Sequence, residues 1–334
     1  MHISYAICDI MCDIIQCDDV ILAYSNDVEI RYSATSGGIG SVLVHRMFER
    51  GIINSAISYE YNNKSLKYIP RIITSSKEYT VSGSIYHEIS LYAYIREHIN
   101  EIKSPFLCFA LPCQVNPIKK LLDDNGIISY IIELTCSSQQ SFEATEYMLK
   151  RVGVKKSDVS FLRYRGEGWP GGIRIELNNG TCVKVPNNDS VWTKIFHSHL
   201  FIMPRCFFCQ PVRENESDIK LADPWGIDFI GKETKGRSLC HVKSNNMAEI
   251  LNEMFNEGLI VYENREKSDF LYSQRGIIAR KKYNLRHPQI TKWVKAILSN
   301  GLYRKIILSS TFFFRVHCYI YTHGYRYLYK MERK

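Results

Sequence analysis

The sequence predicts an α/β protein with a mainly parallel sheet and flanking helices, an antiparallel β-hairpin region and a helical C-terminal tail. Between residues 33 and 153, segments with helical periodicity alternate with short apolar runs rich in β-branched residues. Strand–helix–strand order with short connections implies parallel strands with helices on the faces of the sheet. After residue 160, the turn Asn178-Asn179-Gly180 between two extended runs is typical of an antiparallel hairpin.

The elements follow one another in a regular order. Residues 36–51 predict a glycine-rich turn that opens a helix, and Gly51 ends that helix. The next expected elements are extended runs at 57–61 and 68–74, a helix at 83–99, a buried strand at 105–111, a helix at 113–126, a buried strand at 128–134 and a helix at 141–153. Further helices are expected at 192–201, 247–255 and 289–299.

Length and composition bound the organisation of the chain. At 334 residues and 45% hydrophobic, it can bury a sizeable core. We expect an N-terminal extension at 1–30, a main domain at 31–285 and a basic aromatic helical tail at 286–334. Residues 1–19 carry acids among apolar residues, unlike a secretory signal. Eleven cysteines cannot all pair within one chain, which favours a reducing compartment and predicts a cytoplasmic protein.

Most of the net charge of +9 lies in the tail. Residues 291–334 contain nine Lys or Arg and one acid, so the rest is close to neutral and no nucleic-acid partner is expected. The tail's longest apolar stretch falls short of the ~20 residues that a membrane-spanning helix needs. A basic aromatic helix can lie on an anionic membrane surface, here the inner face, so peripheral membrane contact is one prediction. A helix packed on the domain with an exposed basic face is the alternative.

Four cysteines stand where a ligand site is expected. Cys113 and Cys136 each follow a predicted strand, and the carboxyl ends of parallel strands are where open α/β sheets bind ligands. Cys206 and Cys209 form a CFFC pair. Four thiolates suit either a tetrahedral zinc or a [4Fe–4S] cluster. Only one pair is close in sequence, which gives a weak preference for the cluster, and inert core packing remains open for each single cysteine.

Two glycine-containing turns are candidate phosphate sites. Ser36-Gly37-Gly38 stands at the start of a predicted helix, where free backbone amides and the helix dipole favour an anion. Gly83-Ser84 precedes the next predicted helix and could hold the second half of a pyrophosphate. The alternative is an ordinary turn in the first case and an ordinary N-cap in the second.

An ordered series of motifs resembles the coenzyme F420 hydrogenase/dehydrogenase beta-subunit family. The series is SGG at 36–38, LPCQ at 111–114, Cys136, RYRGEGW at 163–169, CFFC at 206–209, SDIKLADPWGID at 217–228 and KGRS at 235–238. It covers about two-thirds of the chain, from near Tyr32 to near Leu259. Two departures stand out: Ser137-Ser138 replace the usual His-Gly after Cys136, and Ala222 replaces the glycine before Asp223.

The resemblance implies an FAD-binding α/β protein with a [4Fe–4S] cluster beside the flavin. By motif, Cys113, Cys136, Cys206 and Cys209 would be the cluster ligands. Such an oxidoreductase passes electrons between an iron–sulfur partner and a two-electron acceptor, which in archaeal members is a deazaflavin. The chain resembles a short form without the N-terminal ferredoxin domain, so a separate ferredoxin-like protein would exchange electrons with it.

Other readings of this resemblance stay open. Bacterial relatives occur in surface-polysaccharide gene clusters. One alternative is therefore a non-redox binding or accessory protein in cell-surface glycan assembly, with a structural metal site. A zinc module without catalysis is a third.

Four further residues are expected near the flavin or the cluster. Arg163 could stabilise an anionic reduced flavin, and Trp169 could cover a ring face. A surface arginine and a core tryptophan are equally good readings of this pair. Asp223 and Trp225, in the Asp-Pro-Trp-Gly run, are expected near the cluster, with Asp223 holding backbone amides rather than transferring protons.

Overall fold

The computed structural model describes residues 14–188, 190–210, 215–226 and 233–330. The strands of its large sheet are β1 (Val20–Ser25), β2 (Ser55–Asn62), β3 (Lys67–Ile73), β4 (Phe106–Ala110), β5 (Ser129–Leu134), β9 (Ile219–Ala222), β10 (Ser238–Val242) and β11 (Ile260–Arg265). A small sheet contains β6 (Val159–Arg163), β7 (Gly172–Leu177) and β8 (Cys182–Pro186).

The helices divide between the two ends of the chain. Those around the large sheet are α1 (Val28–Ser33), α2 (Ile39–Glu49), α3 (Leu91–Glu97), α4 (Val115–Asp124), α7 (Asn245–Asn256) and α8 (Lys267–Ser273). The others are α5 (Glu143–Arg151), α6 (Val191–Ser198), α9 (Arg275–Arg286), α10 (Pro288–Ser299), α11 (Gly301–Ser309), α12 (Thr311–His323) and α13 (Tyr325–Lys330). Short 3₁₀ turns include η4 (Pro204–Phe208).

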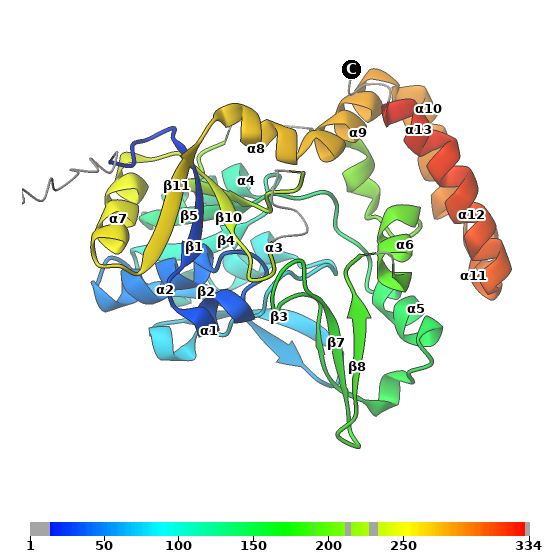
Figure 1. Cartoon of the computed structure of the whole chain (residues 1–334), viewed down its shortest axis with the longest axis horizontal. Helices are drawn as coiled ribbons and strands as arrows, with labels where there is room; N and C mark the ends of the chain where they lie inside the picture. Colours follow the sequence, from blue (N-terminus) through cyan, green and yellow to red (C-terminus); the bar gives the residue numbers. More distant parts are fainter. Residues whose placement is uncertain (1–13, 189, 211–214, 227–232, 331–334) are drawn as a thin grey trace, which may run out of the picture.

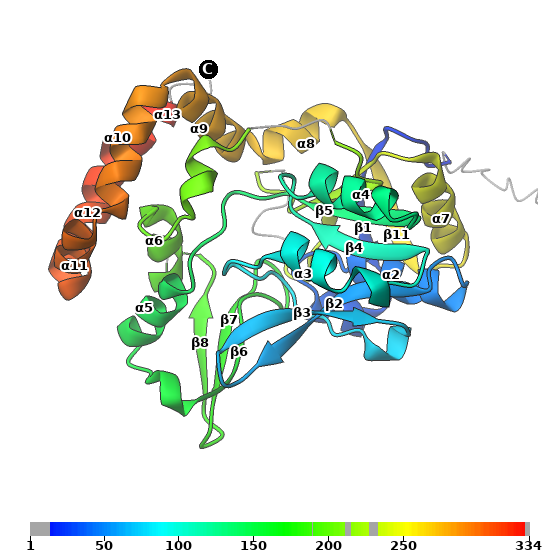
Figure 2. The same cartoon turned by 180° about the vertical axis from the view of Figure 1, so that it is seen from behind.

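The centre of the large sheet is parallel, as predicted. Its order is β11-β1-β10-β9-β5-β4-β2-β3, and β2, β4, β5 and β9 run parallel to one another. The strands on either side, β3 on one flank and β10, β1 and β11 on the other, pair antiparallel. The predicted α/β class, the antiparallel hairpin region and the helical C-terminal part are all confirmed (Figures 1 and 2).

Side-chain alternation along the parallel strands explains how helices cover both faces. Leu107 and Ile132 pack with α2 and α7, whereas their neighbours Phe106 and Ile131 pack with α3 and α4. All four side chains are fully buried. Successive residues of a strand point to opposite faces, so apolar runs such as FLCFA supply both layers at once.

A second core joins the small sheet to the C-terminal helices. Val159, Ile173 and Val185 of the small sheet pack with residues of α5 and α6. Phe314 of α12 and Tyr325 of α13 are buried in the same cluster. The C-terminal helices are therefore anchored to the fold by buried aromatic side chains, and α10–α12 project along one end of the molecule (Figure 1). Within the described ranges, every helix is too short or too polar to cross a membrane.

The structure differs from the sequence expectation at two places. The helix expected at 83–99 forms only from Leu91, because the preceding residues pair with distant strands instead. The Tyr68 amide donates to His87 Nε2 at 2.9 Å, and the Gln140 amide donates to the Tyr86 carbonyl at 3.0 Å. The second difference is β1, which lies between β10 and β11 although residues 1–30 were expected to be an extension.

Candidate functional site

A cavity of about 670 Å³ opens at the carboxyl edge of the parallel strands. Ala110, Leu134 and Ala222, the last residues of β4, β5 and β9, line it. Its walls are rich in aromatic rings: Tyr59, Tyr79, Tyr86, Phe109, Trp192, Phe196 and Trp225. This size and apolar character are typical of a site for a cofactor or a small molecule. The position is the one at which open α/β sheets bind ligands.

The predicted Ser36-Gly37-Gly38 turn forms one wall of this cavity. Gly38 is the N-cap of α2 with φ +83°, and Ser36, Gly38 and Ser41 line the cavity. A helix leaves its first amides without intrahelical acceptors, so amides at the start of α2 are available to an anion in the cavity. Gly37 does not line the cavity, and its amide donates to Ser238 Oγ at 2.9 Å.

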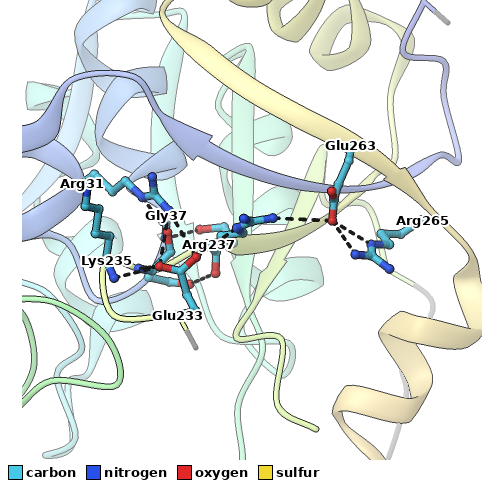
Figure 3. A network of polar contacts seen from close by, with 10 residues as sticks. Arg31, Gly37, Glu233, Lys235, Arg237, Glu263 and Arg265 are labelled. Carbon is cyan, nitrogen blue, oxygen red and sulfur yellow. Dashed lines mark hydrogen bonds and ion pairs between the residues drawn. The ribbon is translucent and has the colours of Figure 1, made fainter. Parts of the chain in front are cut away.

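Residues 233–238 are hydrogen-bonded to this turn. The Glu233 carboxylate accepts bonds from the Lys235 and Gly236 amides at 2.8 and 2.9 Å and from the Arg237 guanidinium at 3.0 Å (Figure 3). Burial alone would raise the pKa of Glu233, but these bonds and the charge of Arg31 lower it. The KGRS motif thus contributes a structural network, and its backbone reaches the turn through the Ser36 hydroxyl, which donates to the Arg237 carbonyl.

Close packing at Gly37 leads to a first prediction. A Cβ at this position would lie 2.3 Å from the Ala23 carbonyl oxygen and 2.6 Å from the Ser238 nitrogen, both backbone atoms. We expect Gly37→Ala to lower the free energy of unfolding by about 2–4 kcal/mol, measured by urea denaturation. Gly301→Ala is the matched control, because no atom lies within 4 Å of its Cβ position and alanine favours a helix. Equal stability of the two variants would contradict this packing argument.

No helix begins directly after the Gly83-Ser84 pair, contrary to the prediction, because α3 begins only at Leu91. Both residues nevertheless line the cavity. Gly83 has φ +71°, and the Ser84 amide donates to Thr35 Oγ1 at 2.7 Å. The two candidate phosphate turns are therefore joined through Thr35, which precedes Ser36 and also lines the cavity.

A buried ion pair between Arg165 and Asp223 forms part of the cavity wall near Trp225. Arg165, only 3% exposed, donates to Asp223 Oδ2 at 2.6 Å and to Oδ1 at 3.3 Å. Trp169 Nε1 also donates to Asp223 Oδ1, at 3.1 Å, and its ring lies 4.9 Å from that of Trp225. Burial would lower the pKa of Arg165, but the adjacent carboxylate outweighs it and raises that pKa. Asp223 therefore accepts side-chain bonds, whereas the sequence predicted that it holds backbone amides.

Some of these tryptophan and arginine side chains line the cavity, and others lie outside it. Trp225, Asp223 and Arg165 line the cavity, whereas Trp169 is buried behind them. Arg163 does not line the cavity, and its guanidinium donates to the Ser33 carbonyl. The sequence prediction named Arg163 as the arginine near the flavin, whereas in the structure Arg165, two residues beyond the end of β6, lines the cavity.

The four predicted cysteines occupy the same edge of the sheet. Cys113 and Cys136 follow β4 and β5, which are parallel neighbours. Cys206 lies in η4 and Cys209 directly after it. This segment is held against the residues after β5, because the Met203 amide donates to the Gln139 carbonyl at 3.0 Å. All four are free thiols, and Cys136 alone among them also lines the cavity.

The four thiols lie near enough to one another to influence the pKa values of Cys136 and Cys113. Burial, against the opposing charge of Lys281 and together with the neighbouring Cys206, Cys113 and Cys209, raises the pKa of Cys136 to about 12. The pKa of Cys113 is also raised, by desolvation first and then by Cys209 and Cys206. In the part of the chain that the structure describes, no three His, Cys, Asp or Glu side chains lie close enough to hold a single metal ion.

Helix α9 supplies residues that sequence reasoning missed. Lys281 Nζ donates to the Cys136 carbonyl at 3.0 Å, and Arg280 donates to the Ser137 carbonyl. Both side chains are more than nine-tenths buried. They lie more than 140 residues from Cys136 in sequence and belong to no motif, so only the folded chain brings them to the cysteines.

Comparisons with known proteins show the family and the fold of this chain. Residues 20–95 and 105–268 match the N-terminal and C-terminal parts of the coenzyme F420 hydrogenase/dehydrogenase beta subunit. Among solved structures, the F420-reducing [NiFe] hydrogenase complex from Methanosarcina barkeri contains a similar chain, with TM-score 0.60 and 16% identity over 81% of this chain and 93% of that one. No curated protein matches the sequence. The structural likeness shows a common fold. The two family matches together show that the chain belongs to the coenzyme F420 hydrogenase/dehydrogenase beta-subunit family, a family of oxidoreductase subunits.

Proposed function

We propose that this protein is an FAD- and [4Fe–4S]-dependent oxidoreductase that passes electrons between an iron–sulfur partner protein and a two-electron acceptor. The observation that supports this most is the position of Cys136. It belongs to the four-thiol group and to the cavity wall at once. A cluster ligated by Cys136 would therefore border a flavin in the cavity, which is what transfer between them requires.

The donor set fits a cluster better than a single ion. Cys113, Cys136, Cys206 and Cys209 would hold it, and a four-iron cube separates its thiolates further than one zinc ion does. The raised pKa values of Cys136 and Cys113 favour protonated thiols, and a bound metal would take up thiolates instead. Such a cluster supplies one-electron transfer. Lys281, whose Nζ bonds the Cys136 carbonyl, would offset part of the negative charge of the four thiolates.

The cavity fits a flavin dinucleotide. The α2 amides beside Ser36 and Gly38 would meet one phosphate, and the Gly83 backbone, next to the Ser84 amide that bonds Thr35, would meet the other. Trp225, with Trp169 behind it, would lie against the ring system. The Arg165–Asp223 pair would fix that wall, and Arg163 would support it from outside the cavity through Ser33.

The electron donor is expected at the surface near Cys113. This cysteine is exposed, so a ferredoxin-like partner could bring its own cluster close to the four thiols. A deazaflavin-like acceptor and a place in a surface-polysaccharide pathway stay predictions from the family resemblance.

Anaerobic reduction of the full chain tests the proposed function. The protein loaded with FAD is mixed with a reduced ferredoxin, and bleaching of the flavin band is followed by stopped-flow absorbance. We expect full bleaching, with a rate that depends on the ferredoxin concentration. A protein that binds no flavin, or whose flavin stays oxidised, would favour the accessory role in glycan assembly with a structural metal.

A second proposal concerns the exposed face of α10–α12. Trp293 is 76% exposed, Phe312 69% and Tyr319 65%, and the exposed cations Lys292, Lys305 and Arg315 lie on the same helices. Aromatic rings and cations together suit the surface of an anionic membrane. Phe314 and Tyr321 anchor the tail to the core, whereas Trp293, Phe312 and Tyr319 are exposed to solvent.

Liposome sedimentation tests the membrane proposal. We expect binding to vesicles that contain phosphatidylserine and little binding to pure phosphatidylcholine. Because each cation near such a surface contributes about 1 kcal/mol, replacing Lys292, Lys305 and Arg315 with glutamine should weaken binding about 100-fold. Replacing Lys119, Lys120 and Lys150, which lie outside the tail, is the matched control. Equal binding of both triple variants would contradict the proposal.

A further inference from the structure

One wall of the cavity is cationic, and its cations come from helices beyond the family match. Arg280 of α9 and Arg326 of α13 line the cavity beside His197 and His199, at the end of α6. The match to the family ends at residue 268. Figures 1 and 2 place α6, α9 and α13 on the opposite side of the molecule from α2. The cationic wall is thus separate from the turn expected to hold the flavin phosphates.

The two arginines lack compensating acids. Among the described residues that line the cavity, Asp223 is the one acid, and both its oxygens bond Arg165. Arg280 is 4% exposed and donates to the Ser137 carbonyl and hydroxyl, which are neutral. Neither Arg280 nor Arg326 forms an ion pair with a carboxylate in the ranges that the structure covers. A buried cation such as Arg280 is costly unless an anion joins it, and Arg326, which is partly exposed, adds a second positive charge to the same wall.

Side-chain hydrogen bonds join the helices that carry the two arginines and the two histidines. Tyr325 Oη donates to Asn284 Oδ1 at 2.5 Å, which fastens α13 to α9 next to Arg326. The Tyr321 hydroxyl bonds His199 Nδ1, which fastens α12 to the end of α6. The helices that carry the two arginines are therefore fixed to each other before a ligand arrives, which lowers the cost of binding.

The positive charge of this wall contributes to the lowered pKa values of the two neighbouring histidines. Burial first, and then the charges of Arg326 and Arg280, lower the pKa of His197 to about 4. The pKa of His199 lies well below its usual value for the same reasons, burial first. Both imidazoles are therefore neutral at pH 7 and add polar groups, but no charge, to the wall.

We propose that Arg280 and Arg326 form a subsite for the phosphate group of an anionic electron acceptor that binds beside the flavin. The proposal rests on the proposed redox function and names the chemical class of its acceptor. The guanidinium fork suits phosphate because it donates two parallel bonds to it. The acceptor's reactive ring would then lie against the flavin, while its phosphate is held at the C-terminal helices.

Calorimetric titration of the flavin-loaded full chain with inorganic pyrophosphate tests the subsite. Arg326→Gln removes the cation that has no structural partner, and we expect its dissociation constant to rise about tenfold or more with flavin content unchanged. Arg315→Gln, an exposed arginine of α12, is the matched control and should bind as the wild type does. Arg326→Lys should be intermediate, because it keeps the charge without the fork.

Two results would overturn the proposal. Equal affinity of Arg326→Gln and wild type would remove the subsite. Displacement of pyrophosphate by FAD, together with loss of flavin from Arg326→Gln, would show that these cations hold the flavin's own phosphates. The same titration on flavin-free protein shows whether the anion site exists even if the redox function fails.

Discussion

Replacing Cys136 with alanine is expected to remove the iron–sulfur cluster and to stop reduction of the flavin by ferredoxin. Cys136 is the thiol that belongs to both the four-cysteine group and the cavity wall, so its loss breaks the ligand set at the point nearest the flavin. Since cluster ligands contribute jointly, we expect iron content to fall by about tenfold or more. Iron analysis and stopped-flow absorbance of the anaerobically purified variant measure both effects.

A control cysteine separates this effect from general damage. Cys182 lies exposed on β8, outside both the cavity and the four-thiol group. Cys182→Ala should keep its iron and its flavin reduction. If Cys136→Ala retained the iron of Cys182→Ala, then Cys136 would not be a ligand, and the adjacency of cluster and flavin would lose its support.

Replacing Asp223 with alanine is expected to destabilise the fold strongly. The Arg165 side chain is 3% exposed and loses its carboxylate partner, while Trp169 Nε1 loses its acceptor. Removing one partner of a buried ion pair typically costs about 3–5 kcal/mol, because a charge remains buried without compensation. Urea denaturation followed by circular dichroism measures the loss.

The surface pair Lys120–Asp124 provides the comparison. Its atoms lie 3.0 Å apart, but the side chains are 77% and 58% exposed. Asp124→Ala should change stability by less than about 0.5 kcal/mol, because solvent screens such a pair. If Asp223→Ala and Asp124→Ala lowered stability equally, the buried pair would not be the structural element described above.

The sequence was sufficient for the parallel core and for the placement of the cysteines. Apolar runs such as residues 105–111 and 128–134 have a pattern that forces burial on both faces, and this identifies parallel strands and their carboxyl ends. Cys113 and Cys136 follow those ends directly, so their common edge could be inferred. The helix start at Gly38 was likewise predictable, because Ser-Gly-Gly precedes a helical pattern.

Long-range pairing accounts for what the sequence did not predict. Residues 83–90 have helical periodicity, yet Tyr68 and Gln140 bond His87 and Tyr86 and hold them extended. Arg165 lies two residues beyond the end of β6, so the course of the turn after this strand decides that Arg165, and not Arg163, reaches Asp223. Arg280, Lys281 and Arg326 reach the site only because the C-terminal helices fold back onto α6. Local periodicity carries no information about any of these contacts.

The convergence of Cys113, Cys136, Cys206 and Cys209 on one cluster is most directly tested by metal analysis of the anaerobically purified full chain, combined with electron paramagnetic resonance after reduction by dithionite. We expect about four iron and four acid-labile sulfide per chain, with the low-temperature signal of a reduced [4Fe–4S] cluster. One zinc per chain with neither iron nor sulfide would contradict this account.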